Sequence, residues 1–264
     1  MLPAQRQQAI LAQVRAQGAA SAEELSRSLG VSVETIRRDL RGLRDQGLLN
    51  RVHGGATRSS RRSSEGSFAA RSTLNLARKQ AIAALAASLV GTEETIVIDT
   101  GTTPLQLARA LSASFRGRVL TNSVLVAAEL SDRSDIELLL CGGQIRPGDG
   151  ACSGTHAEAF FADFYADKAF LGAGGVHPEA GLTDYYPAEA AIRRTITAHS
   201  AATYVLADSS KLGVIAVHRV CALGQLTAVI TDDEENLGAS AALAVSVTLL
   251  HAAPSRQPSL TAAG

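Results

Sequence analysis

From Leu74 onwards, short runs rich in valine, isoleucine and leucine alternate with segments that have the composition of helices. Repeated strand and helix alternation is typical of a parallel sheet with helices on both faces. We therefore expect an α/β fold for most of the chain. The expected strands are 94–99, 118–121, 135–141, 168–173, 203–208 and 227–231. The expected helices end at Val90, begin at Pro104, Ser123 and Pro187, and cover 156–164.

The first 56 residues follow a different pattern, with three short helical segments ahead of a glycine-containing ribbon. Ser21 and Glu24 form the S-x-x-E capping box that starts a helix, and Gly30 is suited to end it. Ser32 is placed to cap the next helix almost at once. Two helices joined by so short a turn predict a helix-turn-helix, whose second helix enters the major groove of DNA. The segment 48–56 then predicts a small two-stranded wing.

The helix after Ser32 contains the stretch TIRRDLRGL, residues 35–43. Its apolar residues recur at i, i+4 and i+7 and form a buried stripe, which turns Arg38 and Arg41 to the opposite side and Arg37 to the flank. Asp39 lies nearer the buried side and is expected to hold an arginine of the protein. The exposed arginines are either a solvated face or a docking face, and their surroundings must decide.

Charge is unevenly distributed, although the formal net charge of the chain is +0. Residues 1–72 contain 12 Arg and 6 acidic residues, whereas residues 73–264 contain 13 basic and 19 acidic residues. A basic module joined to a mildly acidic body indicates a nucleic-acid partner. We expect a winged helix-turn-helix domain over 1–56, a Ser- and Arg-rich linker over 57–72, an α/β effector domain over 73–252 and a flexible tail over 253–264.

Several classes of protein are disfavoured by what the sequence lacks. It has no apolar run of about 18 residues and no signal-peptide pattern, so a cytoplasmic protein without a membrane partner is expected. Cys141, Cys152 and Cys221 are odd in number and widely spaced, which predicts neither a disulfide nor a zinc site. The glycines of GAGGVH do not match G-x-G-x-x-G, so nicotinamide binding is disfavoured. No metal or cofactor is predicted.

The strand that ends at Asp99 is followed at once by TGTTP, residues 100–104. Gly101 permits a tight turn, Thr103 is expected to cap a helix, and Pro104 suits its first position. Helix N-termini attract phosphate through free N–H groups and the helix dipole, and the hydroxyls of Thr102 and Thr103 add donors. A simple capped turn is the alternative reading of this motif.

The same order recurs in LTNS, where Asn122 is the expected cap after Thr121. Two helix starts could then converge on one anion, at the carboxyl ends of the strands where open parallel sheets bind ligands. Lys211 is the favoured cation at these ends. Other residues there that could contact a polar ligand carrying the phosphate are Asp99, Gly142, Gly143, Asp208 and Ser209.

Two further residues are open to either a structural or a ligand-binding interpretation. Lys168 opens a strand instead of closing one, which favours a structural role as much as an effector contact. Glu189 begins the helix PAEAAIRR, where it could meet hydroxyl groups of a ligand or only complement the helix dipole.

The segment SAEELSRSLGVSVETIRRDLRGLRDQGLLNRVHGGA, residues 21–56, resembles the N-terminal domain of the DeoR family of bacterial transcriptional regulators. VIDTGTT, VLTNS, LLLCGGQIRPG, KAFLGAGG, GLTD and LADSSK then follow in the order of that family's effector domain. The resemblance implies a repressor of a sugar or carbohydrate operon. It also implies release from double-stranded operator DNA when a phosphorylated sugar binds a fold shared with ribose-phosphate isomerases and CoA transferases.

The motifs and the resemblance together predict two sets of site residues in a homo-oligomer, since helix-turn-helix modules gain affinity by pairing. The expected DNA-binding residues are Ser32, Thr35, Arg37, Arg38, Arg41, Arg51 and His53. The expected effector-binding residues are Asp99, Gly101, Thr102, Thr103, Thr121, Asn122, Gly142, Gly143, Lys168, Glu189 and Lys211.

Two positions depart from the family pattern. Gly174 stands where many members and the related isomerases carry an acidic residue, and His177 stands near an often polar or acidic position. Isomerase chemistry is therefore disfavoured, and no catalytic residue is predicted. The rival hypotheses are a sugar-phosphate isomerase with a basic appendage, and a DNA-binding module with a purely structural body.

Overall fold

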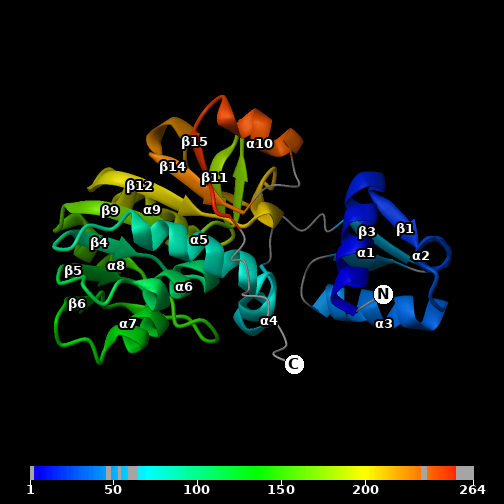
Figure 1. Cartoon of the computed structure of the whole chain (residues 1–264), viewed down its shortest axis with the longest axis horizontal. Helices are drawn as coiled ribbons and strands as arrows, with labels where there is room; N and C mark the ends of the chain where they lie inside the picture. Colours follow the sequence, from blue (N-terminus) through cyan, green and yellow to red (C-terminus); the bar gives the residue numbers. More distant parts are fainter. Residues whose placement is uncertain (1–2, 46–48, 53–54, 59–64, 233–236, 254–264) are drawn as a thin grey trace, which may run out of the picture. The chain divides into compact units, whose positions relative to one another are not determined.

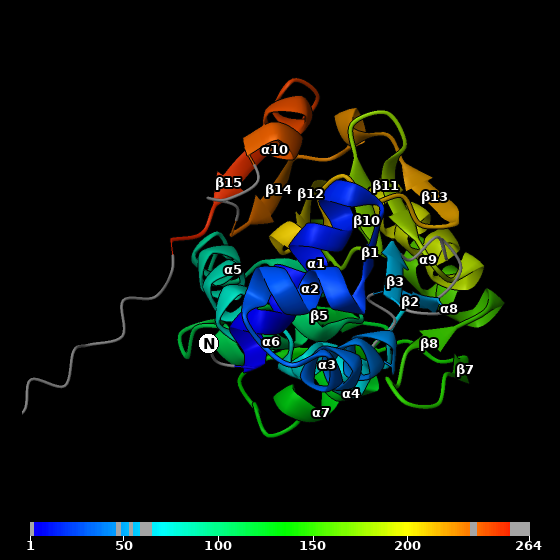
Figure 2. The same ribbon diagram turned by 90° about the vertical axis from the view of Figure 1, so that its right-hand side faces the viewer.

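The computed structural model describes residues 3–45, 49–52, 55–58, 65–232 and 237–253. The chain divides into two units, Met1–Arg71 and Ser72–Gly264, which are described separately. Figure 1 shows the helices and strands of both units, and Figure 2 shows them after a quarter turn. In the described part of the chain, no helix is both long enough and apolar enough to cross a membrane.

The first unit is a three-helix bundle with a small antiparallel sheet. Its helices are α1 (Pro3–Gln17), α2 (Ala22–Leu29) and α3 (Val33–Asp45). Its sheet has the order β1-β3-β2, from β1 (Ala19–Ser21), β2 (Leu49–Val52) and β3 (Gly55–Arg58). The predicted two-stranded ribbon thus gains a third strand, which the short stretch Ala19–Ser21 did not signal. The core is formed by Ile10, Val14, Ala20, Ala22, Leu25, Ile36, Leu40, Leu43 and Leu49.

The stretch predicted as a linker, 57–72, contains regular structure at both ends. The strand β3 runs to Arg58, and the helix α4 covers Phe68–Thr73. Arg71 pairs with Glu65 at 3.1 Å and donates to the carbonyl oxygen of Gly66. These local contacts explain why a polar segment of low hydrophobicity still forms a helical turn. The predicted tail lies outside the described residues from residue 254 onwards.

The second unit is built on a parallel sheet of seven strands in the order β15-β14-β12-β9-β4-β5-β6. All six pairings within it are parallel, which confirms the predicted α/β fold. The strands are β4 (Thr95–Ile98), β5 (Arg118–Thr121), β6 (Glu137–Leu140), β9 (Ala166–Leu171), β12 (Ser200–Leu206), β14 (Ala228–Thr231) and β15 (Thr248–His251). The order runs in opposite directions on either side of the β4/β9 pair. Ligands of open parallel sheets bind beside such a reversal, at the strands' carboxyl ends.

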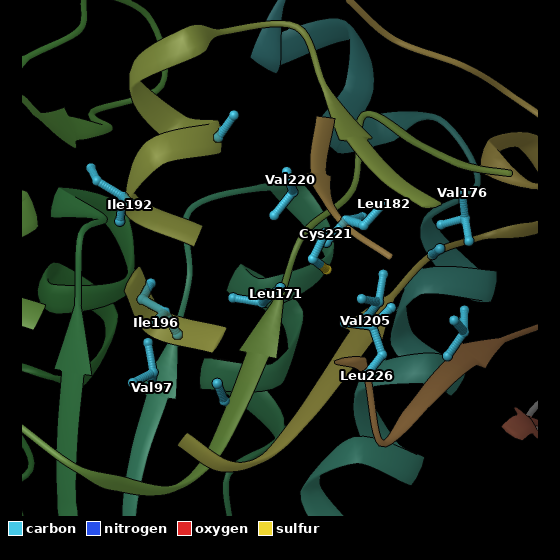
Figure 3. Close-up of a cluster of buried hydrophobic side chains, with 14 of the residues drawn as sticks. Val97, Leu171, Val176, Leu182, Ile192, Ile196, Val205, Val220, Cys221 and Leu226 are labelled. Atoms are coloured by element: carbon cyan, nitrogen blue, oxygen red, sulfur yellow. The ribbon is translucent and has the colours of Figure 1, made fainter. Parts of the chain in front are cut away.

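Helices cover both faces of this sheet (Figure 1). On one face lie α5 (Leu76–Ser88), α6 (Thr102–Ala110) and α7 (Val124–Leu130), and on the other lie α8 (Thr155–Ala162) and α9 (Pro187–Ala198). Figure 3 shows the core beneath α9, where Ile192 and Ile196 lie near Val97. Alternate side chains along each strand point toward these helices. The layer between the sheet and α9 is therefore apolar.

Several short elements of the second unit were not predicted. A three-stranded antiparallel sheet combines β10 (Gly175–His177), β11 (Gly181–Asp184) and β13 (His218–Cys221). The hairpin of β7 (Gln144–Ile145) and β8 (Cys152–Ser153) precedes α8. The remaining elements are η1 (Ser209–Lys211), η2 (Leu223–Gln225) and α10 (Leu237–Ala244). Apart from α10, which has eight residues, these elements have two to four residues each and carry too little periodicity to be recognised in a sequence.

Candidate functional site

The helix-turn-helix is shaped by three caps that the sequence predicted. The Ser21 hydroxyl accepts from the Glu24 N–H at 3.1 Å, and the Glu24 carboxylate accepts from the Ser21 N–H at 2.8 Å. Gly30 ends α2 in the left-handed conformation, with φ at 65°. The Ser32 hydroxyl then accepts from the Thr35 N–H at 3.2 Å and starts α3. Gly30 and Ser32 therefore fix the turn between the two helices, and the Ser21 and Glu24 box fixes the start of α2.

The helix α3 is amphipathic in the way its spacing predicted. Its apolar stripe is buried, whereas Arg37, Arg38 and Arg41 are exposed. Arg37 lies 3.8 Å from Glu23, and Arg41 lies 3.1 Å from Glu34. Both pairs are about half exposed, where ion pairs contribute about 1 kcal/mol or less, so DNA phosphates can displace the acids. For Arg38, no hydrogen bond or ion pair of its side chain occurs within the described residues.

Asp39 takes the structural role that its position predicted. It is only 6% exposed, and its carboxylate accepts from the Arg6 Nε of α1 at 2.5 Å. This contact raises the pKa of Arg6, and the hydrogen bond that Arg6 donates to Asp39 is the main cause. Asp39 therefore attaches α3 to α1 and leaves the positive charge of the exposed arginines intact. In the wing, Arg51 lies in β2, and His53 lies outside the described residues.

In the second unit, the loop after β4 lies at the strand reversal. Asp99 is fully buried, and its Oδ2 accepts from the Gly172 N–H at 3.0 Å and from the Arg193 Nε at 2.6 Å. Gly172 directly follows β9, so one carboxylate joins the carboxyl ends of the two strands that flank the reversal.

The helix α6 starts two residues earlier than predicted. Its N-cap is Gly101, with φ at 139°, and not Thr103, so Pro104 is the third helical residue and not the first. Because Gly101 has no side chain, it cannot accept from the first helical N–H groups. The N–H groups of Thr102 and Thr103 are therefore left without a helical acceptor, and their hydroxyls have no hydrogen-bond partner within the described residues. This is the arrangement of an anion-binding helix start.

The second helix start is also capped by a different residue from the one predicted. Ser123, and not Asn122, caps α7 by accepting from the Val126 N–H at 3.2 Å. Asn122 instead accepts with Oδ1 from the Thr100 N–H at 2.9 Å, which ties it to the loop before α6. The Thr121 hydroxyl donates to the Ile98 carbonyl at 2.6 Å and stays within the sheet. Asn122 thus belongs to the α6 loop, and Thr121 has a structural role.

Three buried polar atoms at the ends of β4 and β5 have no hydrogen-bond partner within the described residues: Oδ1 of Asp99, Oγ1 of Thr100 and Nδ2 of Asn122. Leaving such a group unsatisfied costs about 1 to 3 kcal/mol, so native proteins usually pair them with protein, water or ligand. Their concentration in two neighbouring loops, after β4 and after β5, beside the α6 helix start indicates a binding site.

Lys211 lies along the same edge of the sheet. It ends η1, directly beyond β12, and its Nζ lies 5.8 Å from the centroid of the Tyr185 ring. A Cβ at Gly174 would lie 3.1 Å from the same ring, and one at Gly172 would lie 3.6 Å from Pro104 of α6. The residues after β9 therefore lie between the α6 helix start and the ring of Tyr185, which Lys211 approaches.

Residues 74–233 match the DeoR C terminal sensor domain, and residues 6–62 match the DeoR-like helix-turn-helix domain. The first match alone covers more than half of the chain.

The chain belongs to the DeoR family.

Curated relatives of this DeoR family chain match along most of its length. It is 33% identical over 236 residues to the HTH-type transcriptional regulator GolR of Listeria innocua, covering 89% of this chain and 93% of the relative. It is 34% identical over 232 residues to the glycerol-3-phosphate regulon repressor of Escherichia coli, covering 88% and 92%. Among solved structures, ribose 5-phosphate isomerase A of Methanocaldococcus jannaschii matches 52% of this chain and 54% of its own, with 20% identity and a TM-score of 0.39.

The chain is thus a helix-turn-helix transcriptional regulator of the DeoR family with a C-terminal sensor domain. The rival hypothesis of an isomerase carrying a basic appendage is not what these relatives support, because they are named as regulators and repressors. The sensor domain is the unit that contains the α6 helix start and Lys211.

A buried charge cluster behind the α6 loop was missed by sequence reasoning. Arg193 of α9 is 3% exposed and pairs with Asp99, with Asp184 and, at 3.2 Å, with Glu189. Arg146 from the hairpin β7–β8 also pairs with Glu189 and lies 3.7 Å over the Tyr186 ring. The one available signal was the pair Glu189 and Arg193 at i and i+4 on a single helix.

Glu189 is therefore buried in this cluster and does not stand at an open helix start. Burial is the main cause that raises its pKa to about 7, with Asp184 and Asp99 adding to the rise and Arg193 and Arg146 opposing it. The cluster fixes the orientation of Asp99, and Glu189 acts on the α6 loop only through Arg193.

Three predicted effector-binding residues lie away from the α6 loop: Lys168, Gly142 and Gly143. Lys168 lies near the amino end of β9, opposite the site, and its ammonium pairs with Glu94. This strand-start position leaves Lys168 outside the candidate site. Gly142 and Gly143 are exposed after β6, and Gly143 approaches Ser153 so closely that a Cβ would lie 2.4 Å from its carbonyl oxygen.

The two positions that depart from the DeoR family pattern have structural explanations. Gly174 donates its N–H to the Thr183 carbonyl at 3.0 Å, and a Cβ there would lie 2.8 Å from the Asp184 Cα. An acidic side chain at Gly174 does not fit this strand approach. His177 accepts with Nδ1 from the N–H groups of Glu179 and Ala180, at 3.2 and 3.3 Å, and so shapes the turn between β10 and β11.

Proposed function

We propose that the protein represses a sugar or carbohydrate operon and leaves operator DNA when a phosphorylated sugar binds its sensor domain. The observation that carries this proposal is the α6 helix start, where two N–H groups, two threonine hydroxyls and three unpaired buried polar atoms are concentrated at the strand reversal. The name of one relative, the glycerol-3-phosphate regulon repressor, agrees with a phosphate ester as effector.

The proposed ligand contacts divide between two groups of residues. Thr102 and Thr103 take the phosphate with their N–H groups and hydroxyls, and Lys211 neutralises part of its charge. Asp99, through Oδ1, and Asn122, through Nδ2, take sugar hydroxyls, since both atoms lack a hydrogen-bond partner in the part of the chain that the structure describes. Gly101 admits the ligand because it presents only backbone at the helix start.

Operator DNA is proposed to meet the exposed face of α3. Arg37, Arg38 and Arg41 contact base edges or phosphates, with Ser32 and Thr35 at the helix start and Arg51 and His53 in the wing. The regulator acts as a homo-oligomer, so the operator has two-fold symmetry with half-sites about one helical turn apart. DNA footprinting tests this, and protection of a single isolated half-site by a monomer contradicts it.

The effector proposal is tested by release of the full-length protein from its own promoter DNA, followed by fluorescence anisotropy. The probes are glycerol 3-phosphate, ribose 5-phosphate, fructose 1-phosphate and inorganic phosphate, each ester being compared with its unphosphorylated parent. Effector coupling is commonly about 1 to 3 kcal/mol, so an active ester should weaken operator binding roughly 5-fold to 150-fold. Equal release by the unphosphorylated parent overturns the phosphate assignment.

Two variants and one control locate the site. Thr102→Val removes a hydroxyl and keeps the side-chain shape, and Lys211→Ala removes the cation, so both should lower ester affinity and leave ester-free operator affinity nearly unchanged. Lys168→Ala is the matched control because that ammonium lies at the opposite edge of the sheet. A normal ester response in both site variants contradicts the proposed pocket.

A further inference from the structure

The turn that carries Lys211 is attached to the first helix of the sensor domain. Nδ2 of Asn75 donates to Oδ1 of Asp208 at 3.3 Å, and Nη1 of Arg78 donates to the Ser209 hydroxyl at 2.9 Å. The partners are separated by 133 and 131 residues in sequence. The N-cap residue of α5 and a side chain of its first turn therefore hold a turn that was predicted to bind effector.

Asp232, directly beyond β14, completes this attachment. Its Oδ1 accepts from the Ser209 N–H at 2.8 Å, and its Oδ2 lies 3.3 Å from the Arg78 Nε. The carboxylate side chain is 8% exposed, and burial is the main cause that raises its pKa. One nearly buried carboxylate thus joins the α5 guanidinium to the backbone of the η1 turn. We refer to the contacts of Asn75 and Arg78 with Asp208, Ser209 and Asp232 as the α5 clasp.

Asn75 has an unusual backbone for this position. Its φ of 55° and ψ of 32° are left-handed, and within the described residues no other non-glycine residue has a positive φ. It stands at the N-cap of α5, but its side chain does not cap the helix. The amide instead donates to Asp208 of the η1 turn. This contact fixes the break between α5 and α4, which ends at Thr73.

Asn75 and Arg78 of the α5 clasp also lie close in sequence to the DNA-binding domain. The helix α5 is the first long helix after the DNA-binding domain, and α4 precedes it by two residues. At the other end of the η1 turn, the Lys211 N–H donates to the Asp208 carbonyl at 2.8 Å. Any movement of Lys211 that shifts this turn therefore acts on the segment through which the chain enters the sensor domain.

We propose that the α5 clasp couples ester binding at Lys211 to operator affinity, with Asn75 and Arg78 as its positioning residues. The inference rests on the proposed function, because it requires an ester at the α6 site. An effector alters DNA affinity only if it interacts differently with two states of the protein. The α5 clasp can differ between two such states, because its contacts depend on the position of the η1 turn.

The test compares three variants of the full-length protein with the wild type. Arg78→Ala removes the contacts to Ser209 and Asp232, and Asn75→Gly removes the amide while keeping a residue that adopts the left-handed backbone freely. Arg118→Ala is the matched control, because it breaks an arginine–carboxylate pair with Glu137 at a distant strand pair. Thermal unfolding first establishes that each variant is folded.

Two affinities are then measured for each protein. Operator affinity is measured by fluorescence anisotropy with and without the most tightly binding ester among glycerol 3-phosphate, ribose 5-phosphate and fructose 1-phosphate. Ester affinity without DNA is measured by isothermal titration calorimetry. In Arg78→Ala and Asn75→Gly, the ratio of the two operator affinities should fall from the wild-type value, expected between 5-fold and 150-fold, towards one. Both should still bind the ester.

Each result decides between the coupling and the ligand proposals. An unchanged ratio in both clasp variants overturns the coupling role while the proposed function stands. A ratio lost only because the ester no longer binds also overturns it, since Arg78 then acts within the pocket. If the wild type binds none of the three esters, the proposed function and this inference both fall. A double-mutant cycle of Arg78→Ala with Asp232→Asn should be non-additive in the ratio, because both changes break the same contact.

Discussion

The guanidinium of Arg193 lies against the carboxylate of Asp99, with 2.6 Å between Nε and Oδ2. The two residues are 94 positions apart, and both are almost completely buried. Because Oδ2 of Asp99 is held by Arg193 and by the Gly172 N–H, only Oδ1 remains for a ligand. Asp99, which the sequence places at the end of β4, is therefore oriented by Arg193 of α9, a helix that lies far from it along the chain.

Replacement of Arg193 should destabilise the sensor domain strongly. Arg193→Ala leaves Asp99, Asp184 and Glu189 buried without their shared cation, and breaking a buried pair costs about 3 to 5 kcal/mol. Urea unfolding measures the change. Arg109→Ala is the control, because its pair with Glu129 is exposed and should contribute less than about 1 kcal/mol. Equal effects of the two substitutions would contradict a structural role for the buried cluster.

The charge state of Glu189 should make stability depend on pH. Its folded pKa of about 7 is above the unfolded value of 4.5, so the folded state holds the proton more tightly. This contribution to stability is fully present below pH 4.5 and is lost as pH rises through about 7. Glu189→Gln cannot titrate, so its free energy of unfolding should fall less than that of the wild type between these pH values, by about 1 to 3 kcal/mol. Parallel pH profiles would show that Glu189 is ionised throughout.

The parts of the molecule that depend on local pattern could be predicted from the sequence. The Ser21 and Glu24 box, the Gly30 cap and the exposed arginines of α3 follow from spacing within one or two turns, where neighbours in sequence are neighbours in space. The six strands beginning with β4 were recognised because each is a short apolar run between helical segments.

Long-range pairing could not be predicted in the same way. Asn122 looked like a helix cap because it follows a strand, but the hydrogen bond to Thr100, 22 residues away, uses its side chain differently. The buried Arg193 resembled any helical arginine until the fold placed three carboxylates around it. The strand β15 fell in a segment without a recognisable motif, and its place at the sheet edge depends on pairing with β14.

Restoring an acid at Gly174 should destabilise the protein instead of creating an isomerase-like site. In Gly174→Asp the new Cβ would lie 2.8 Å from the Asp184 Cα and 2.9 Å from the Thr183 carbonyl oxygen, both of them backbone atoms. Overpacking of this kind costs about 1 to 3 kcal/mol. Gly142→Ala is the matched control, since a Cβ there meets no atom within 4 Å. Denaturant unfolding compares the two variants. An unchanged free energy of unfolding in Gly174→Asp would show that the backbone around Gly174 can move to accept the side chain.

The arginine face of α3 should control operator binding without contributing to stability. Arg37→Ala and Arg38→Ala each remove an exposed side chain, so both variants should unfold like the wild type. A contact to a base edge is worth about 1 to 3 kcal/mol, and its loss should weaken operator binding roughly 5-fold to 150-fold and relax sequence preference. A contact to phosphate should instead lower the slope of log affinity against log salt by about 0.9.

Asp39→Ala separates these two effects, because Asp39 lies on the same helix but binds Arg6 and not DNA. It should lower the stability of the DNA-binding domain by leaving the partly buried Arg6 without its partner. At temperatures where Asp39→Ala is folded, its salt slope should match that of the wild type. If Arg37→Ala and Arg38→Ala both bind operator normally across a salt titration, α3 is not the recognition helix, and the exposed arginines are only a solvated face.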